Sequence, residues 1–165
     1  MAMIHSRFPM RDRRHERTAQ LALAALRAAV GGVLAVHGWA KLSDVAGTAQ
    51  SFEQLGMPAA QTLVYFAIAG ELFGGLGLAL GFLTRVAALG PLCTMLVAIV
   101  TVHLGHGLLA KNGGFEYPLV LLLVSAFFAF NGAGAYSLDA ALERRLPSLL
   151  RRVPRMRNQL PGQPL

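Results

Sequence analysis

The sequence predicts an all-α integral membrane protein, a four-helix bundle of up-down-up-down topology with both termini cytoplasmic. Composition is the first basis of this prediction, because the 165 residues are 55% hydrophobic and only 14% charged. The second is a set of apolar runs at residues 18–40, 58–84, 86–110 and 117–138. Each run reaches the roughly 20 residues that a helix needs to cross a bilayer core. The third is the gathering of positive charge at the two ends of the chain.

The four runs lack the polar stripe that a helix of a water-soluble bundle carries, so lipid is their expected surrounding. The first run is long for a signal core and contains Arg27 and His37, which favours a retained span over a cleaved signal. We therefore expect a basic cytoplasmic arm at residues 1–17, a transmembrane domain at 18–142, and a basic, proline-containing cytoplasmic tail at 143–165.

The basic residues give the orientation. Of the 15 Lys and Arg residues, five arginines precede the first run and six follow the fourth. Arg85 links runs two and three, whereas the other two links hold only Lys41 and Lys111. Positive charge near helix ends stays in the cytoplasm, and a bacterial inner membrane is the expected location. The net charge of +7 is split between two membrane-flanking tails, a pattern typical of anionic-lipid contact, so no nucleic-acid partner is expected.

Cys93 is the single cysteine and lies in the third run. One thiol forms no internal disulfide, and the chain has no C-x-x-C motif, which argues against a quinone-linked disulfide-forming enzyme. We expect Cys93 to be a small buried apolar side chain.

Glu71 is the only charged residue in residues 58–84. A charge at mid-bilayer is costly, so such a residue normally turns inward and is paired or neutralised. The helical positions three and four further on are Gly74 and Gly75, which share its face. The same segment carries two G-x-x-x-G motifs, formed by Gly70, Gly74, Gly77 and Gly81. Small residues allow close helix approach, so Glu71 is expected at a helix–helix seam, and the glycine faces offer a route to a homo-oligomer.

Arg27 is the expected partner of Glu71. Counted from the cytoplasmic ends of the first two runs, the two residues differ in depth by roughly 6 Å, within reach of an arginine side chain. The pair has two interpretations: a structural ion pair that fixes helix register, or a carboxylate that carries a proton or binds a headgroup.

Polar side chains from several segments reach one level at the outer end of the predicted bundle. The candidate cofactor-binding residues of this layer are His37, Lys41, His103, His106, Glu116 and Tyr117. Each has a simpler role as well, since Tyr117 and the neighbouring Trp39 suit an interfacial aromatic belt, and a membrane histidine can bond a neighbouring carbonyl. Together they are able to bind quinone carbonyl oxygens, or alternatively haem or a transition metal. Quinone is the preferred cofactor, and no residue is assigned to catalysis or to a metal.

An internal similarity links the two halves of the chain. "HGWAK" at residues 37–41 resembles "HGLLAK" at 106–111, and each is followed by Phe-Glu and then a proline. A repeated hairpin and a chance similarity both remain open.

The segments "LRAAVGGVLAVHGWAKL", "AGELFGGLGLALGFLTR", "HLGHGL" and "GGFEYPLVLLLVSAFFAFNGAGAYSLD" together resemble the DoxX family of small bacterial membrane proteins with four helices. The resemblance extends over residues 21–142. It implies the four-helix fold and, through the family's thiosulfate:quinone oxidoreductase subunits, quinone-linked redox chemistry.

Two functions from different classes follow. One is a quinone-linked redox subunit, which requires a protein partner because this chain has no flavin or nucleotide fingerprint and no cysteine pair. The other is a non-catalytic membrane anchor or assembly factor, or a small-solute carrier.

Overall fold

A computed structural model describes the backbone of residues 13–150 and the side chains of residues 13–145. Every regular element in this part of the chain is helical, which confirms the all-α prediction. The outer parts of the predicted basic arm and tail, residues 1–12 and 151–165, lie outside the described residues.

The long helices are interrupted by short turns of different helical type. In chain order the elements are α1 (Arg13–Ser43), α2 (Val45–Gln54), α3 (Ala60–Ile68), the π-helical turn η1 (Ala69–Phe73), α4 (Gly74–Leu80), α5 (Thr84–Ala98), a second π-helical turn η2 (Ile99–His103), the 3₁₀ turns η3 (Leu104–His106) and η4 (Ala110–Asn112), α6 (Glu116–Asn131) and α7 (Leu138–Leu150). A π turn holds one residue more than an α turn between hydrogen-bonded groups, and such turns are frequent at functional sites.

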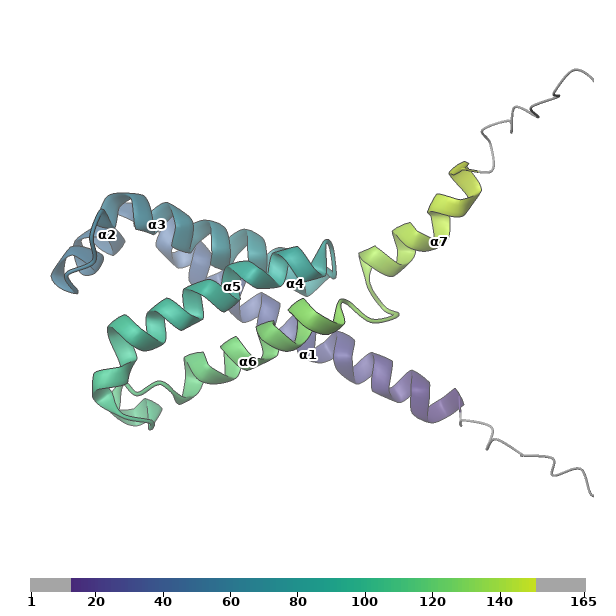
Figure 1. Ribbon diagram of the computed structural model, residues 1–165, viewed down its shortest axis with the longest axis horizontal. Helices are drawn as coiled ribbons and strands as arrows, with labels where there is room; N and C mark the ends of the chain where they lie inside the picture. The colour runs from purple at the N-terminus through teal and green to yellow at the C-terminus, as the bar shows by residue number, and fades with distance from the viewer. Residues whose placement is uncertain (1–12, 151–165) are drawn as a thin grey trace, which may run out of the picture.

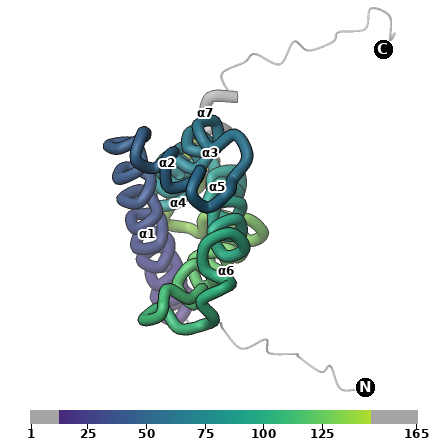
Figure 2. Tube along the Cα trace, turned by 90° about the vertical axis from the view of Figure 1, so that its left-hand side faces the viewer, coloured from purple at the N-terminus to yellow at the C-terminus, as the bar shows by residue number. Residues whose placement is uncertain are grey.

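Figure 1 shows how these elements are arranged. α1 runs the length of the bundle, α3 to α4 returns beside it, α5 runs back, and α6 returns again. The view along the bundle in Figure 2 places α1 on one side and α5 with α6 on the other. We call the end that carries α2 and η4 the distal end, and the end at the turn between α4 and α5 the proximal end.

Within residues 13–150, three segments are long and apolar enough to cross a membrane: Arg13–Ser43, Ala60–Leu80 and Thr84–His106. The fourth apolar helix, α6, is shorter, with 16 residues. The fourth crossing, the up-down topology and the cytoplasmic termini therefore stay predictions.

Glycines bring α1 into backbone contact with the returning segment. A Cβ added to Gly31 would lie 2.5 Å from the Ala79 nitrogen and 2.6 Å from the Gly75 oxygen. A Cβ on Gly38 would meet the backbone of Leu72 in the same way. Because lipid is as apolar as leucine, such close packing, rather than burial from water, must hold these helices together.

The opposite side of the same segment packs on α5. Gly70 lies against Gly90, and Gly74 lies against Pro91 and the Ala87 carbonyl. The glycine faces that the sequence offered for contact between copies are thus occupied within one chain.

Most buried apolar side chains of the described residues belong to two clusters. The larger one joins α1, α4, α5 and α6 and consists of Val30, Leu34, Leu78, Ala88, Met95, Leu121 and Phe128. The smaller one fastens α2 near the distal end and consists of Ala35, Ala49, Val64, Ile68 and Leu72. α2 itself begins at Asp44, whose side chain accepts a hydrogen bond from the Gly47 N–H at 2.8 Å, as expected of an N-cap.

The two similar segments "HGWAK" and "HGLLAK" adopt different backbones. The first is continuous α-helix within α1. The second leaves the helix at Gly107, which has φ of +77°, and continues through a loop into η4. The similarity in sequence does not extend to the local structure.

Candidate functional site

A groove runs between the segment α3–η1–α4 and the segment α5–η2, with a cavity volume of about 1020 Å³. Most of its lining is apolar and includes Phe66, Phe73, Leu76, Leu89 and Val97. Gly70 and Gly90, at which the two segments touch, are among its lining residues. Charged or imidazole groups line it only toward the distal end, where α2 and the turn after it add Phe52 and Met57.

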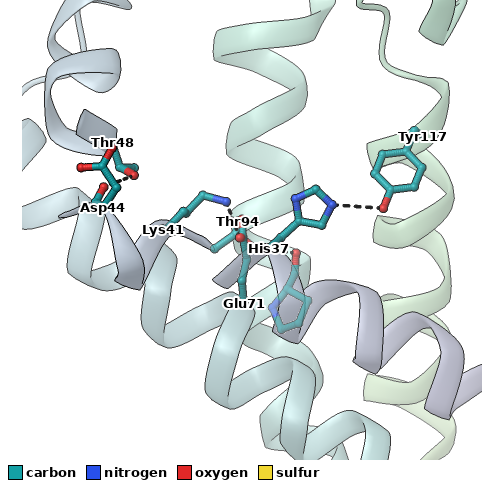
Figure 3. Close-up of polar contacts among 8 residues, drawn as sticks. His37, Lys41, Asp44, Thr48, Glu71, Thr94 and Tyr117 are labelled. Atoms are coloured by element: carbon teal, nitrogen blue, oxygen red, sulfur yellow. Dashed lines mark hydrogen bonds and ion pairs between the residues drawn. The ribbon is translucent and has the colours of Figure 1, made fainter. Parts of the chain in front are cut away.

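Lys41 and Glu71 form an ion pair at this distal end, and Figure 3 shows their side chains directed toward each other. Glu71 is 4% exposed and sits in the π turn η1. The Lys41 side chain is 23% exposed and lines the groove together with Glu71. Glu71 lies where its segment packs between two helices, as its neighbouring glycines predicted. Gly70 faces α5 and Gly75 faces α1.

The expected contact between Arg27 and Glu71 is not formed. Arg27 is 3% exposed, and its guanidinium donates hydrogen bonds to the carbonyl oxygens of Ala133 at 2.5 Å and Tyr136 at 2.8 Å. It lies beside Gly81 at the proximal end, whereas Lys41, the partner of Glu71, is about four turns further along α1, roughly 21 Å away. The depth count went wrong because it assumed that both apolar runs begin at one level. The contacts of Gly31 with Ala79 and of Gly38 with Leu72 instead place Arg27 level with Gly81.

Asp139 completes the proximal contacts and was missed by the sequence interpretation. Its carboxylate accepts hydrogen bonds from the backbone N–H groups of Leu83 at 2.7 Å and Thr84 at 2.9 Å, which caps the start of α5. Burial works to raise the pKa of Asp139, but the hydrogen bonds from Thr84 and Leu83 and the positive charge of Arg27 outweigh it and lower that pKa. A carboxylate directly after the fourth apolar run was the only sequence signal for this role.

His37 and Tyr117 meet across a different part of the distal end. The Tyr117 hydroxyl lies 3.4 Å from His37 Nε2, so the two side chains bridge α1 and α6. Both are exposed, and neither lines the groove. They share the level of Lys41 but not its cavity.

The remaining predicted layer residues belong to the distal loop. His103 Nδ1 lies 2.6 Å from the Gly113 oxygen, and His106 Nδ1 lies 3.0 Å from the Val102 oxygen. Glu116 accepts a hydrogen bond from the Ala110 N–H at 2.6 Å. Among these, His103 alone lines the groove. Of the predicted layer, Lys41 and His103 line the groove, where Glu71 joins them, and the other members hold loops and helices together.

Cys93 and Thr94 also line the groove. The expectation that Cys93 is buried is wrong, because its side chain is exposed on this face of α5. The hydroxyl of Thr94 donates to the Pro91 carbonyl at 3.2 Å, so it is held near Gly70 and the η1 turn.

The chemistry of the groove follows from this distribution. Lys41 offers N–H donors, and Glu71 offers acceptors or, when protonated, a donor. The Gly113 carbonyl can only accept, so Nδ1 of His103 is the donor of that bond, and Nε2 of a neutral ring is left as an acceptor. An apolar groove with a few polar groups at one end suits an amphipathic molecule that has a small polar head and a long apolar tail.

The sequence matches one protein family and is similar to two bacterial proteins. The family model described as DoxX matches residues 22–104, from α1 to the first residue after η2. The chain is 34% identical to "Putative oxidoreductase CatD" of Bacillus subtilis over 69% of this chain and 81% of that protein. It is likewise 34% identical to "Inner membrane protein YqjF" of Escherichia coli over 66% of this chain and 82% of that protein.

No solved structure matches the chain. The family match contains Arg27, Lys41, Glu71 and His103, and thus the polar end of the groove. With its apolar helices of membrane-crossing length and its inner-membrane relative, the molecule is a multi-pass protein of the inner membrane. The chain belongs to the DoxX family.

Proposed function

We propose that this DoxX protein is the membrane subunit of a redox complex and that its groove binds a quinone, with the headgroup at Lys41, Glu71 and His103. The observation that carries the proposal is the single polar end of an otherwise apolar groove about 1020 Å³ in volume. Such a shape matches a polar ring on an isoprenoid tail. The name of the Bacillus relative, a putative oxidoreductase, supports the same class of chemistry.

The groups at the polar end fit this cofactor. A bound quinone would carry two electrons and two protons between protein partners. Lys41 would donate a hydrogen bond to a carbonyl oxygen of the headgroup, and Glu71 beside it would hold or release a proton. His103 would accept a hydrogen bond through Nε2, because its Nδ1 is engaged with Gly113. The electrons would come from or go to a partner protein, since this chain has no cysteine pair of its own.

The proposal also includes how the chain is oriented across the membrane. Four crossings with both termini in the cytoplasm would place the distal end at the periplasmic side of the inner membrane. The headgroup would then sit near the outer surface, and the tail would lie along α4 and α5 toward the middle of the bilayer.

A non-catalytic anchor or small-solute carrier is the competing function. The contacts at the proximal end favour this function. Hydrogen bonds of Arg27 and Asp139 hold α1, α5 and α7 together there without any bound molecule. An anchor would need no occupant in the groove, so occupancy of the groove separates the two functions.

Cys93 offers a direct measure of occupancy, because it is the single cysteine of the chain and lies in the groove. We expect short-chain ubiquinone or menaquinone analogues to slow the alkylation of Cys93 by a small maleimide in purified protein. Lys41→Gln and His103→Ala should lose this protection. The matched controls are Lys111→Gln and His106→Ala, which replace the same residue types outside the groove and should keep it.

Two results would count against quinone binding. Equal protection of Cys93 by an alkyl alcohol of the same tail length would mean that the groove binds any lipid chain and does not recognise the quinone headgroup. No protection by either compound would leave the anchor as the better account of the molecule.

A further inference from the structure

We infer that α7 is an interfacial helix whose apolar face rests on the anionic lipid surface around the proximal end of the bundle. The inference does not depend on quinone binding, because α7 lies at the opposite end of the bundle from the polar end of the groove (Figure 1).

The start of α7 is fixed against the end of the membrane-crossing segments. The Asp139 N–H donates to the Gly81 carbonyl at 2.9 Å, and its carboxylate binds the backbone of Leu83 and Thr84. These residues form the turn at which one crossing segment ends and the next begins. Tyr136, just before α7, is 47% exposed, and tyrosine is enriched where bilayer meets water. The first turn of α7 thus lies at the level of the lipid headgroups.

α7 leaves the bundle after this turn (Figure 1), and it carries an apolar stripe that no helix of the described part of the chain covers. Leu138 and Leu142, one turn apart, are 45% and 49% exposed. The sequence repeats leucine at positions 146 and 149, which continues the same helical spacing. Glu143 and Arg144 are exposed beside the stripe. Arg145 falls within the leucine stripe by the same spacing. A helix that carries an apolar stripe together with exposed basic residues is typical of segments that lie in the interface plane.

The charge of this segment selects anionic lipid. From Leu142 to the end of the chain the sequence has one carboxylate side chain, Glu143, and six arginines: Arg144, Arg145, Arg151, Arg152, Arg155 and Arg157. Clustered arginines next to a membrane helix are attracted to phosphatidylglycerol and similar headgroups. A protein partner would also cover leucines, but it would not require this excess of arginine in the sequence after the last apolar run.

Spin labels on the full chain test the inference. In a Cys93→Ser background, Leu142→Cys and Arg144→Cys place a label on the two faces of α7, and both positions lie outside the packed bundle. In nanodiscs that contain phosphatidylglycerol, we expect the label at residue 142 to be accessible to oxygen and shielded from a water-soluble nickel complex. The label at residue 144 should show the reverse.

The difference between the two labels in accessibility to oxygen and to the nickel complex should be smaller in purely zwitterionic nanodiscs and at high salt. Equal access of the nickel complex to both labels in anionic nanodiscs would overturn the inference. Shielding of residue 142 from both reagents would also overturn it, because a protein surface rather than lipid would then cover the stripe. A monodisperse elution profile of each variant establishes that the chain is folded.

Discussion

Single residues neutralise the two buried charges of the membrane region in different ways. Glu71 meets the ammonium group of Lys41, which reaches it from one turn beyond His37 on α1. Arg27 has no carboxylate in hydrogen-bond contact among the described residues, and instead donates to two carbonyl oxygens, with Asp139 supplying negative charge nearby. Removing one member of a buried pair leaves the other uncompensated, which typically costs about 3–5 kcal/mol. The two sites are far apart, so their effects on stability should be independent.

A double-mutant cycle tests this independence. Lys41→Ala should lower the free energy of unfolding in detergent, and adding Glu71→Gln should restore most of the loss, because no unpaired carboxylate remains. Arg27→Ala should also destabilise, but Glu71→Gln should not rescue it. Thermal unfolding of the purified variants gives the comparison. Rescue of Arg27→Ala by Glu71→Gln would mean that these two side chains do interact.

Whole elements are held together by backbone contact rather than by large side chains. Gly31 of α1 touches Gly75 and Ala79, whereas a Cβ on its neighbour Gly32 would meet nothing within 4 Å. The two positions therefore give a matched pair. Gly31→Ala should force α1 away from α4 and lower the thermal midpoint. Gly32→Ala should be neutral or slightly stabilising, since alanine favours a helix over glycine by about 1 kcal/mol. Equal midpoints for the two variants would mean that the seam is not tightly packed.

The helices themselves were largely predictable from the sequence, since apolar runs of bilayer length permit few other structures. The glycine spacing around Glu71 likewise predicted a tight seam. The partner of Glu71 was not predictable, because register between α1 and the returning segment is set by contacts such as Gly38 on Leu72, which no depth count contains. The division of the distal layer was hidden for a related reason. Helical spacing does not show that the loop after η3 folds back, so that His103 binds the Gly113 carbonyl and Glu116 binds the Ala110 N–H.

For the whole molecule, the open question is its orientation across the membrane. The arginine distribution predicts that reporter fusions after Arg85 and at the C-terminus are cytoplasmic, and that fusions near Gln50 and Asn112 are periplasmic. Paired alkaline phosphatase and fluorescent-protein fusions at the four points give the measurement. A periplasmic C-terminus would reverse the orientation. It would move the polar end of the groove to the cytoplasmic side and α7 to the outer leaflet.

If α6 forms the predicted fourth crossing, its short length affects the lipid around the protein. Its 16 residues span about 24 Å, against a hydrocarbon thickness of about 30 Å. Exposed Val120, Leu123, Phe127 and Phe130 give this helix a large apolar surface, so the neighbouring acyl chains must shorten or tilt to match it. The 31 residues of α1 impose no such demand. In that case the bilayer would be deformed on one side of the protein, and hydrophobic mismatch would favour thin membranes and short-chain detergents for keeping α6 in place.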